Sequence, residues 1–505
     1  MKFKILIFTM SIFFTCYGIA KNVLNIMIYD CDRIPYESDA TANVKDIIYV
    51  QVLSSLLEIK NGVLHPKLLK NAYYDYQNEE YVLEMHEKTY FHNSRLATLD
   101  DLEFSILRYD YALLNKGTEL KNILGINKIS ELKLKKYQRG VIDGIKQELP
   151  NKLRIKLADP DPDFLYKFLH WNYSLVAIEE LQDNFMNWKT YPIGAGPFKV
   201  NPPGFQNGIL QLKKFEETFQ TEVDEVNIHT KLVKNVEFDI SINGVYPGFK
   251  EFYTETPFFQ LAINFINANE LGNNINFRKF VQSAISSREL EKISNTFNSV
   301  YLDTKQGNNG NEIWGTKHYS SFYNPKLAKQ YYEKIPKHLR NKEWLVTVFS
   351  GTNEIPKDKV PYYSEIKKIL TNYGFKMKFA IFNQQFLPKE LAEKAAFDMD
   401  YYMVFPDEYL SKYSRLMHNY PDIYPKPLYD PVLEKLYDNA TKAKSREEKY
   451  LLVNKLSNYI HEKAYRIPLL ERGNNINYNP KTIKKLSENE NELLSLKVDE
   501  IVFVK

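Results

Sequence analysis

Histidines beside acidic residues are the first candidates for chemistry in this sequence. Zinc sites of helical metalloproteases need two histidines four residues apart around a glutamate, so that both imidazoles lie on one helix face. His86-Glu87 is followed by His92 rather than by a histidine at position 90. His461-Glu462 has no downstream partner. The spacing therefore predicts no zinc site, and we interpret the histidines as surface or core residues.

Motifs for nucleotide and acyl-transfer chemistry are also missing. The sequence contains no P-loop and no Gly-x-Ser-x-Gly nucleophile motif. Gly194-Ala195-Gly196-Pro197 cannot open a dinucleotide-binding helix because the proline stops the pattern, so we interpret it as a turn. No spacing of serine, histidine and aspartate nominates a catalytic triad. The sequence thus favours a protein that is not an enzyme and uses no cofactor.

Composition bounds the class of protein. The chain has 505 residues, of which 44% are hydrophobic and 26% charged, enough to bury the cores of two or three domains. Its 67 basic and 63 acidic residues give a formal net charge of +4. This charge is too small for the electrostatic field that attracts nucleic acid. The two cysteines, Cys16 and Cys31, exclude a disulfide-stapled scaffold and a cysteine-rich metal site.

The first twenty residues have the pattern of a signal peptide. Lys2 and Lys4 precede an apolar stretch that ends at Gly18-Ile19-Ala20. The stretch is about 15 residues long, shorter than the ~20 that a spanning helix needs. We therefore predict export, with cleavage after Ala20 and a soluble mature protein.

A lipid anchor on Cys16 is the alternative at this end of the chain. The residues before it, Phe13-Phe14-Thr15, lack the small residue expected beside a lipid-modified cysteine. We therefore prefer cleavage after Ala20.

Predicted strands and helices alternate through the mature chain, as in sheets covered by helices. Strands are expected at Val23–Tyr29, Tyr81–Met85, Leu153–Leu157, Leu345–Phe349, Lys376–Ile381 and Ile501–Val504. Helices are expected at Ala42–Ile59, after Thr98, from Asp163, and at Phe277–Ile293, Pro325–Lys334, Tyr362–Tyr373 and Arg446–Ala464. Thr98 with Asp101 three residues on is similar to a capping box.

Five segments, taken in order, carry a resemblance to a known family. They are Leu53-Ser54-Ser55-Leu56 with residues 61–69, residues 81–93, Thr98-Leu99-Asp100-Asp101-Leu102-Glu103-Phe104-Ser105, Tyr191-Pro192-Ile193-Gly194-Ala195-Gly196-Pro197-Phe198 and residues 276–289. The fourth is the sharpest match, to a Pro-x-Gly-x-Gly-Pro-aromatic turn. Together they resemble the extracytoplasmic solute-binding proteins of ABC importers, specifically the peptide-binding group called solute-binding protein family 5.

The resemblance implies an α/β, two-lobed periplasmic-binding-protein fold (type II, cluster C-like) with an extra subdomain in the first lobe. After the signal peptide at 1–20, the first lobe would take residues 21–45, 155–262 and 475–505. The inserted subdomain would take 46–154 and the second lobe 263–474. The lobes would be joined by a hinge and would close on the ligand.

The resemblance also implies a ligand anchor in the second lobe. Family members that bind peptides hold the α-amino group of the ligand with an aspartate, and residues 397–410 place Asp407 at that position. A carboxylate facing an ammonium group in a closed cleft makes a charge-assisted hydrogen bond. Phe405 and Tyr409 of the same stretch are further candidates for ligand binding. A surface carboxylate is the alternative interpretation of Asp407.

This stretch departs from the family pattern. The glycine-aromatic pair usual just upstream is Met403-Val404 here, and Pro406 precedes the aspartate. The departures leave the class of ligand open.

Two further stretches resemble ligand-contacting parts of the family. Residues 239–244 resemble the first-lobe strand and loop that meet the ligand backbone, which makes Asn243 and Gly244 candidates. An ordinary Asn-Gly turn is the alternative. Residues 467–472 match a family strand but place Glu471 and Arg472 where aromatics are common, so the two could contact a charged ligand or pair with each other.

The function implied by the resemblance is capture of peptides between hinged lobes and delivery to an ABC permease, by a periplasmic monomer that binds no nucleic acid. One alternative keeps the fold but binds a sugar, a metal chelate or another solute, or serves as a sensor. A second alternative is a secreted hydrolase whose catalytic residues lie far apart in the sequence.

Overall fold

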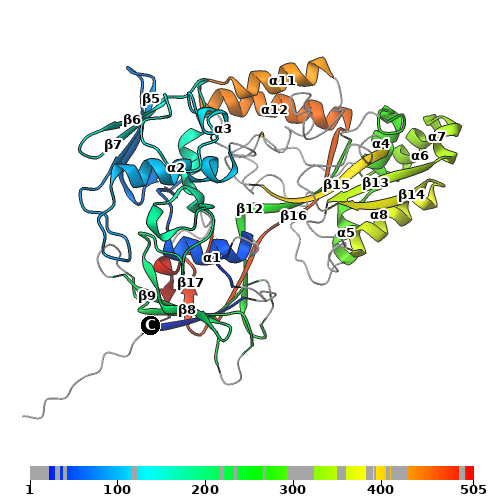
Figure 1. The fold of residues 1–505 in the computed structure, drawn as a ribbon. Helices are drawn as coiled ribbons and strands as arrows, with labels where there is room; N and C mark the ends of the chain where they lie inside the picture. The colour runs from blue at the N-terminus through cyan, green and yellow to red at the C-terminus, as the bar shows by residue number, and fades with distance from the viewer. Residues whose placement is uncertain are drawn as a thin grey trace, which may run out of the picture.

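The computed structural model shows two bodies joined by a pair of long strands (Figure 1). It describes residues 22–28, 34–37, 42–114, 120, 122–215, 221–232, 236–242, 244, 246–265, 269–293, 323–349, 360–382, 391, 394–404, 410, 430–487 and 495–504. Within these ranges, only the backbone is described at 42–43, 253–260, 291, 349, 400–404 and 471–474. The predicted signal peptide, Cys16 and Cys31 lie outside the described residues.

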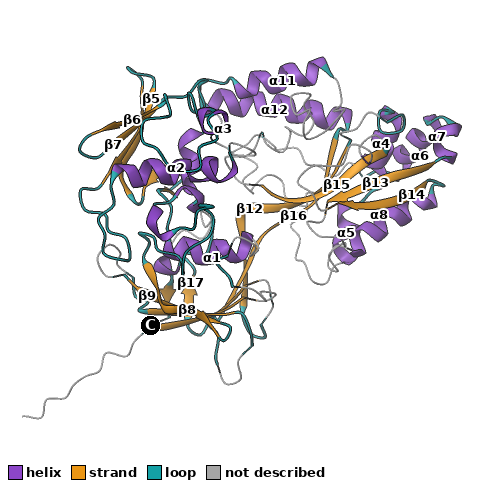
Figure 2. Cartoon of the chain, viewed as in Figure 1, coloured by secondary structure: helices purple, strands orange, loops and turns teal. Residues whose placement is uncertain are grey.

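Helices and strands alternate along most of the chain (Figure 2). The helices are α1 Ala42–Val52, α2 Leu99–Leu113, α3 Lys128–Glu131, α4 Ile275–Ala284, α5 Ser287–Ile293, α6 Pro325–Lys334, α7 Lys337–Asn341, α8 Val360–Asn372, α11 Pro431–Thr441 and α12 Arg446–Lys463, with 3₁₀ turns η1 Phe164–Leu169, η2 Trp171–Tyr173, η3 Ile178–Glu180 and η5 Val498–Glu500. The strands are β1 Val23–Ile28, β2 Leu57–Lys60, β3 Val63–Pro66, β4 Leu69–Asp75, β5 Glu80–Met85, β6 Ile145–Glu148, β7 Lys152–Ile155, β8 Phe198–Gln206, β9 Ile209–Lys214, β10 Glu225–His229, β11 Ile240–Ile242, β12 Lys250–Asn264, β13 Glu343–Phe349, β14 Lys376–Phe382, β15 Ala395–Val404, β16 Arg466–Tyr478, β17 Ile483–Lys485 and β18 Val502–Phe503.

One ten-stranded sheet runs through both bodies, in the order β14-β13-β15-β12-β16-β11-β1-β10-β9-β8. The long strands β12 and β16 pair with each other at its centre and belong to both halves. A separate four-stranded sheet, β4-β5-β7-β6, lies beside α2 in the first body (Figure 1). The chain therefore has an α/β architecture whose two halves share one sheet through two strands.

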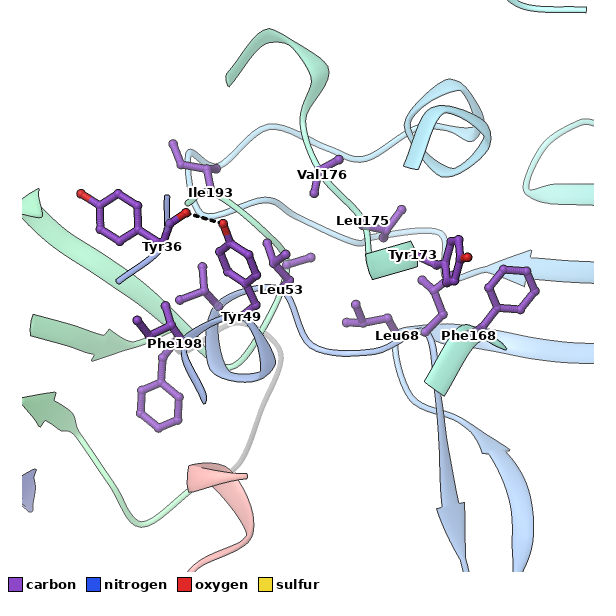
Figure 3. Close-up of a cluster of buried hydrophobic side chains, with 14 of the residues drawn as sticks. Tyr36, Tyr49, Leu53, Leu68, Phe168, Tyr173, Leu175, Val176, Ile193 and Phe198 are labelled. Carbon is purple, nitrogen blue, oxygen red and sulfur yellow. Dashed lines mark hydrogen bonds between the residues drawn. The ribbon is translucent and has the colours of Figure 1, made fainter. Parts of the chain in front are cut away.

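The described apolar residues form two separate hydrophobic clusters. The first takes residues between Leu24 and Ile242 and again between Ile476 and Ile501, and we call the body around it the first lobe. Figure 3 shows a part of this cluster that includes Tyr49, Phe168 and Phe198. The second takes residues between Leu261 and Met399 and between Ile467 and Leu470, and the body around it is the second lobe. Because burial of apolar surface drives folding, each lobe has its own core.

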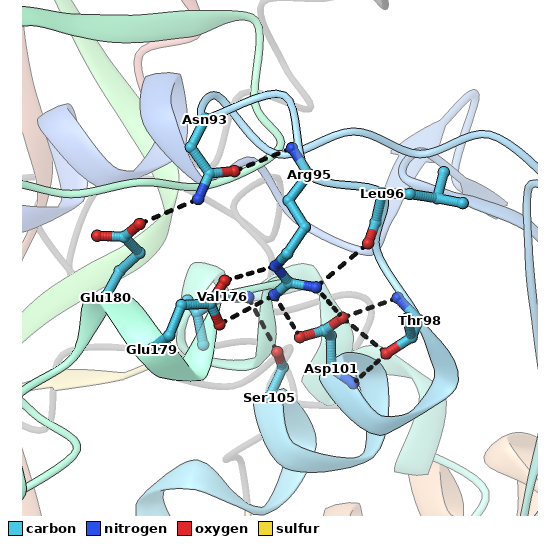
Figure 4. A network of polar contacts seen from close by, with 9 residues as sticks. All are labelled: Asn93, Arg95, Leu96, Thr98, Asp101, Ser105, Val176, Glu179 and Glu180. Atoms are coloured by element: carbon cyan, nitrogen blue, oxygen red, sulfur yellow. Dashed lines mark hydrogen bonds and ion pairs between the residues drawn. The ribbon is translucent and has the colours of Figure 1, made fainter.

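The start of α2 is fixed by local sequence, as predicted. The side chain of Thr98 accepts a hydrogen bond from the backbone N–H of Asp101, and the Asp101 carboxylate accepts one from the backbone N–H of Thr98, which completes a capping box. Arg95 adds two hydrogen bonds to the Asp101 carboxylate and also pairs with Glu179 (Figure 4). These contacts tie the helix to the 3₁₀ turn η3 of the same lobe.

Three predicted helices differ from the structure. The helix expected at Ala42–Ile59 ends at Val52, because Ser54 takes a positive φ of 61° and the chain turns into β2. The helix expected from Asp163 is only the short 3₁₀ turn η1. The helix expected at Phe277–Ile293 is broken into α4 and α5, since Ile285 has the φ and ψ of a strand. The other predicted strands and helices are confirmed to within a few residues.

Among the described residues, none of the helices combines the length and the apolarity that a membrane span requires.

Candidate functional site

The strand pairing shows which ends of the strands in each lobe point toward the other lobe. In the first lobe, β11 lies parallel to β1 and antiparallel to β16, with Ile240 opposite Tyr478 and Ile242 opposite Ile476. Because β16 enters this lobe from the second lobe, the carboxyl end of β11 points back toward the second lobe. Strand β10 is also parallel to β1, so its carboxyl end lies at the same edge.

The second lobe mirrors this arrangement. Strands β13, β14 and β15 are parallel, and β15 is antiparallel to β12, with Asp398 opposite Asn264 and Val404 opposite Phe258. Because β12 leaves the first lobe at Lys250 and runs into the second, the carboxyl end of β15 points toward the first lobe. Ligands of open α/β sheets bind outside the carboxyl ends of the strands. In both lobes, the carboxyl ends of these strands thus face the region between the lobes.

The crossing strands lose their regular pairing between the two edges. Tyr253 of β12 pairs with Asn475 of β16, but the next paired residues are Phe258 and Gly473. Four residues of β12, 254–257, therefore stand opposite the single residue 474. An interrupted ladder bends more easily than a regular one. The break lies between the two hydrophobic clusters, where a hinge would need it.

The two strand ends are close together along β16. Ile242 is opposite Ile476, while Val404 is opposite Phe258, which is itself opposite Gly473. At about 3.3 Å per residue, the ends are offset by roughly 10 Å along the strand direction. Across the sheet, β12 and β16 lie between the two strand ends.

Most of the predicted ligand residues follow these strand ends. Asn243 comes directly after β11, and Phe405, Asp407 and Tyr409 come after β15, but all four lie outside the described residues. Glu471 belongs to β16, opposite Gln260 of β12, and only its backbone is described. The roles assigned to these five residues stay predictions.

Gly244 is the one predicted site residue whose contacts are described. Its carbonyl oxygen accepts a hydrogen bond from the Ser241 hydroxyl, with an Oγ–O distance of 2.7 Å. It accepts a second from Asn477, with an Nδ2–O distance of 2.8 Å. Ser241 and Asn477 face each other across β11 and β16, and both are fully buried. Two neighbouring strands therefore hold the loop that begins at the carboxyl end of β11.

Sequence reasoning missed Ser241 and Asn477 as site residues. Polar side chains inside strands are buried at a cost unless they are hydrogen-bonded. A serine between two isoleucines in β11 and an asparagine beside Ile476 in β16 were the available signals. Such side chains are candidates for holding a loop.

His229 ends β10 at the same edge. It is buried, its Nε2 lies 3.5 Å from Oδ1 of Asn25, and its ring contacts Phe238 edge-on with centroids 5.2 Å apart. Burial lowers the pKa of His229, so the imidazole is neutral at neutral pH. In the described part of the chain, no group of three or more His, Cys, Asp and Glu side chains could hold a metal ion.

Comparison with solved structures finds this architecture in binding proteins. The periplasmic binding protein DppA from Helicobacter pylori, in complex with the peptide STSA, is 15% identical, with a TM-score of 0.68 over 96% of this chain and 98% of that one. The oligopeptide-binding protein AppA from Bacillus subtilis, in complex with a nonapeptide, is 14% identical, with a TM-score of 0.64 over 96% of this chain and all of that one. This chain has the fold of these binding proteins.

A nickel ABC transporter protein from Bacillus halodurans shares the fold as well, with 14% identity and a TM-score of 0.66 over 96% of this chain and 100% of that one. No protein-family model matches the sequence, and no curated protein matches it. The resemblance of the five sequence segments is thus confirmed at the level of the fold, including its two lobes.

Proposed function

We propose that this chain is the extracytoplasmic substrate-binding protein of an ABC importer, a member of solute-binding protein family 5 that captures peptides and hands them to a membrane permease. The observation that carries the proposal is the pairing geometry, in which the carboxyl ends of β11 and β15 point toward each other across the broken ladder of β12 and β16. A binding protein needs facing edges and a flexible connection between them. The fold shared with two peptide complexes supports the same conclusion.

In this proposal the two lobes divide the work of holding a peptide. Asp407, three residues after β15, receives the α-amino group, while Phe405 and Tyr409 flank it. Asn243 and Gly244, directly after β11, meet the peptide backbone, and Glu471 contacts the ligand from the crossing strand β16. A buried carboxylate fixes the direction of the peptide, whereas backbone contacts accept many sequences.

The same proposal fixes the organisation of the chain. The first lobe takes residues 21–45, 155–262 and 475–505, the inserted subdomain takes 46–154, and the second lobe takes 263–474. The mature protein begins after Ala20 and works in the periplasm as a monomer, with an anchor on Cys16 as the alternative. No bond of the ligand is made or broken, because closure supplies affinity and opening at the permease releases the ligand.

A non-peptide solute is the second candidate for the ligand. Met403-Val404 replaces the glycine-aromatic pair of peptide-binding members, and a nickel ABC transporter protein has the same fold. A sugar or a metal chelate in the same place would have no α-amino group, so Asp407 would contribute little to binding.

A thermal-shift screen of residues 21–505 against peptides tests the proposal. Peptides should raise the melting temperature, since a ligand that binds only the folded state stabilises it by mass action. N-acetylated copies of the active peptides should lose most of that shift. Asp407→Asn should weaken binding of the free peptides, by more than about tenfold for a lost charge-assisted bond.

Asp183→Asn is the matched control, because it makes the same change at an exposed aspartate of the first lobe. Indifference of every binding peptide to acetylation would remove the role of Asp407. A melting temperature that responds to sugars or metal chelates but to no peptide would transfer the proposal to the second candidate.

A further inference from the structure

The α11–α12 hairpin forms another bridge between the lobes, separate from the crossing strands. Helix α12 extends from the first lobe to the second lobe, where it leads into β16 (Figure 1). Its two ends are held by different kinds of contact, and this difference is the basis of the inference.

The carboxyl end of α12 is fixed to the second lobe through backbone carbonyls. Arg278 of α4 donates from Nε to the carbonyl oxygen of Lys463 at 2.9 Å, and Gln282 of α4 donates to that of His461 at 3.1 Å. Directly after the helix, the hydroxyl of Tyr465 donates to Asp430 at the start of α11 at 2.7 Å. The chain then continues without a break into β16, so this end moves with the second lobe.

The amino end of α12 reaches the first lobe through charged side chains. Lys449 lies 2.6 Å from Oδ2 of Asp163 and 3.0 Å from Oδ1 of Asp161, measured from Nζ. Arg446 lies 2.9 Å from Oδ1 of Asp163, measured from Nε, and its guanidinium group covers the ring of Tyr166 at 3.6 Å from the centroid. Four charged groups and one aromatic ring make the contact.

Both aspartates are firmly part of the first lobe. They precede η1, whose residues Phe164 and Phe168 are buried in the first hydrophobic cluster. The carbonyl oxygen of Asp161 accepts a hydrogen bond from the hydroxyl of Tyr81 in β5 at 2.6 Å. Since about twelve residues of helix, or roughly 18 Å, separate Lys449 from His461, α12 bridges the distance between the lobes as a rod.

The charged groups of this contact are largely shielded from water while it is intact. The side chain of Asp163 is 2% exposed and that of Lys449 12% exposed. Burial acts to raise the pKa of Asp161, but the charges of Lys449 and Lys167 outweigh it and hold the pKa below its ordinary value. Removal of one partner from a buried ion pair leaves the other charge buried without compensation. If the lobes separate instead, water solvates both charged groups.

The described hydrophobic core of the first lobe does not extend into α12. Among the described residues, the buried apolar side chains of α12, Val453, Leu456 and Ile460, do not belong to the first hydrophobic cluster. The described contacts of this end with the first lobe are therefore mainly ionic, with the ring of Tyr166 covered by Arg446.

We propose that Asp161 and Asp163 with Arg446 and Lys449 form an ionic latch, which holds the lobes of the ligand-free protein in the arrangement seen here and sets ligand affinity by biasing closure. The latch rests on the proposed function, because it acts on the motion that captures the ligand. When it opens, α12 swings away with the second lobe about the broken ladder of β12 and β16. A protein whose binding-competent arrangement is less populated binds its ligand more weakly in the same proportion.

Small-angle X-ray scattering of the ligand-free mature protein tests the latch directly. Lys449→Met and Asp163→Asn should each increase the radius of gyration, and the double variant should increase it no further than the larger single effect. Lys455→Met is the matched control, since it makes the same change at an exposed lysine of the same helix. Lys449→Arg keeps the charge and should restore most of the compact arrangement.

Circular dichroism melting distinguishes an opened latch from a damaged fold. A larger particle with cooperative melting supports the latch, and Arg446→Met at the more exposed position replaces Lys449→Met if that variant does not fold. An unchanged radius of gyration in variants with a lower melting temperature would show that the cluster only stabilises the fold, and this result would overturn the proposal. A wild-type particle larger than this structure and insensitive to every variant would overturn it too.

The consequence for ligand binding is a separate measurement. For any peptide found in the thermal-shift screen, Lys449→Met should raise the dissociation constant about tenfold, as expected for a coupling between distant groups. Scattering needs no ligand, so an unchanged particle overturns the latch whatever the peptides do. If no peptide binds, the proposed ligand fails and the scattering result still decides the latch.

Discussion

Two loops of the first lobe are each held through a glycine carbonyl, but their surroundings differ. In the turn Gly194–Pro197, the carbonyl oxygen of Gly196 lies 2.9 Å from Nε2 of His92. In the loop after β11, the carbonyl oxygen of Gly244 accepts hydrogen bonds from Ser241 and Asn477. The first turn lies inside the lobe, and the second loop lies at the edge that faces the other lobe.

The interior turn leaves no space for a side chain at Gly194 or Gly196. A Cβ atom added to Gly196 would lie 2.5 Å from the carbonyl oxygen of Gln51, and one added to Gly194 would lie 2.5 Å from that of Val52. The backbone N–H of Gly196 also donates to the carbonyl oxygen of Val52 at 2.9 Å. Close backbone packing thus fixes this turn against α1, whereas the described hydrogen bonds to the Gly244 carbonyl come from side chains. The comparison separates residues that pack inside the lobe from residues that hold the loop where we propose ligand binding.

Gly196→Ala should give the largest loss of stability. The new methyl group would collide with the backbone of α1, which cannot move away as the end of a flexible side chain could, so we expect a loss of about 3 kcal/mol in the free energy of unfolding. Chemical denaturation measures it. Gly62→Ala, at an open position with a φ of 72°, should cost only about 1 kcal/mol from backbone strain. Equal losses in the two variants would contradict the close packing inferred for the turn.

Acid should weaken the interior turn through His92. Burial lowers the pKa of His92 from its ordinary value near 6.5 to about 4, since a protonated ring would be poorly solvated there. As the pH falls from 6.5 to 4, His92 becomes protonated in the unfolded chain but stays largely neutral in the folded one. Stability should therefore fall across that window, by about 3 kcal/mol at its lower end.

His92→Gln removes this titration and serves as the reference. Urea denaturation of both proteins at several pH values should show the wild type losing more stability between pH 6.5 and 4. Parallel curves for the two proteins would mean that His92 titrates normally in the folded state.

Ser241→Ala should give the smallest effect, and it should appear in binding. The Gly244 carbonyl keeps its bond from Asn477, so stability should fall by at most about 1 kcal/mol. The loop should be less well positioned, and the dissociation constant of a bound peptide should rise roughly threefold, within the worth of one neutral hydrogen bond. Isothermal titration calorimetry measures this.

Ser130→Ala is the matched control for that variant. The Ser130 hydroxyl also donates to a backbone carbonyl, that of Asn127, but it does so in α3 of the first lobe. A rise in the dissociation constant in both variants, or in neither, would remove Ser241 from the binding edge.

Local signals in the sequence predicted local structure well. The capping box at Thr98 and Asp101 predicted the start of α2. Helix α6 has the predicted bounds, and its start is fixed by the N-cap Asn324 and by Pro325 in its first turn. The predicted end of α1 was wrong, because the true end depends on a positive φ at Ser54, which serine rarely adopts.

Features that join distant parts of the chain could not be predicted in the same way. The proposed latch pairs Lys449 with Asp161, 288 residues earlier in the chain. The loop after β11 is held by a hydrogen bond from Asn477 to Gly244. No periodicity relates such positions, since only the fold brings them together. The family resemblance named Asn243 and Gly244 but could not name Ser241 and Asn477, which hold the Gly244 carbonyl.

The mass of the small molecules carried by the protein tests the central claim most directly. Protein purified from its native host is denatured, and the released compounds are identified by mass spectrometry. The account predicts intact peptides with free amino termini, held without chemical change. Release of sugars or metal chelates alone, or the conversion of added peptides into cleavage products, would contradict it.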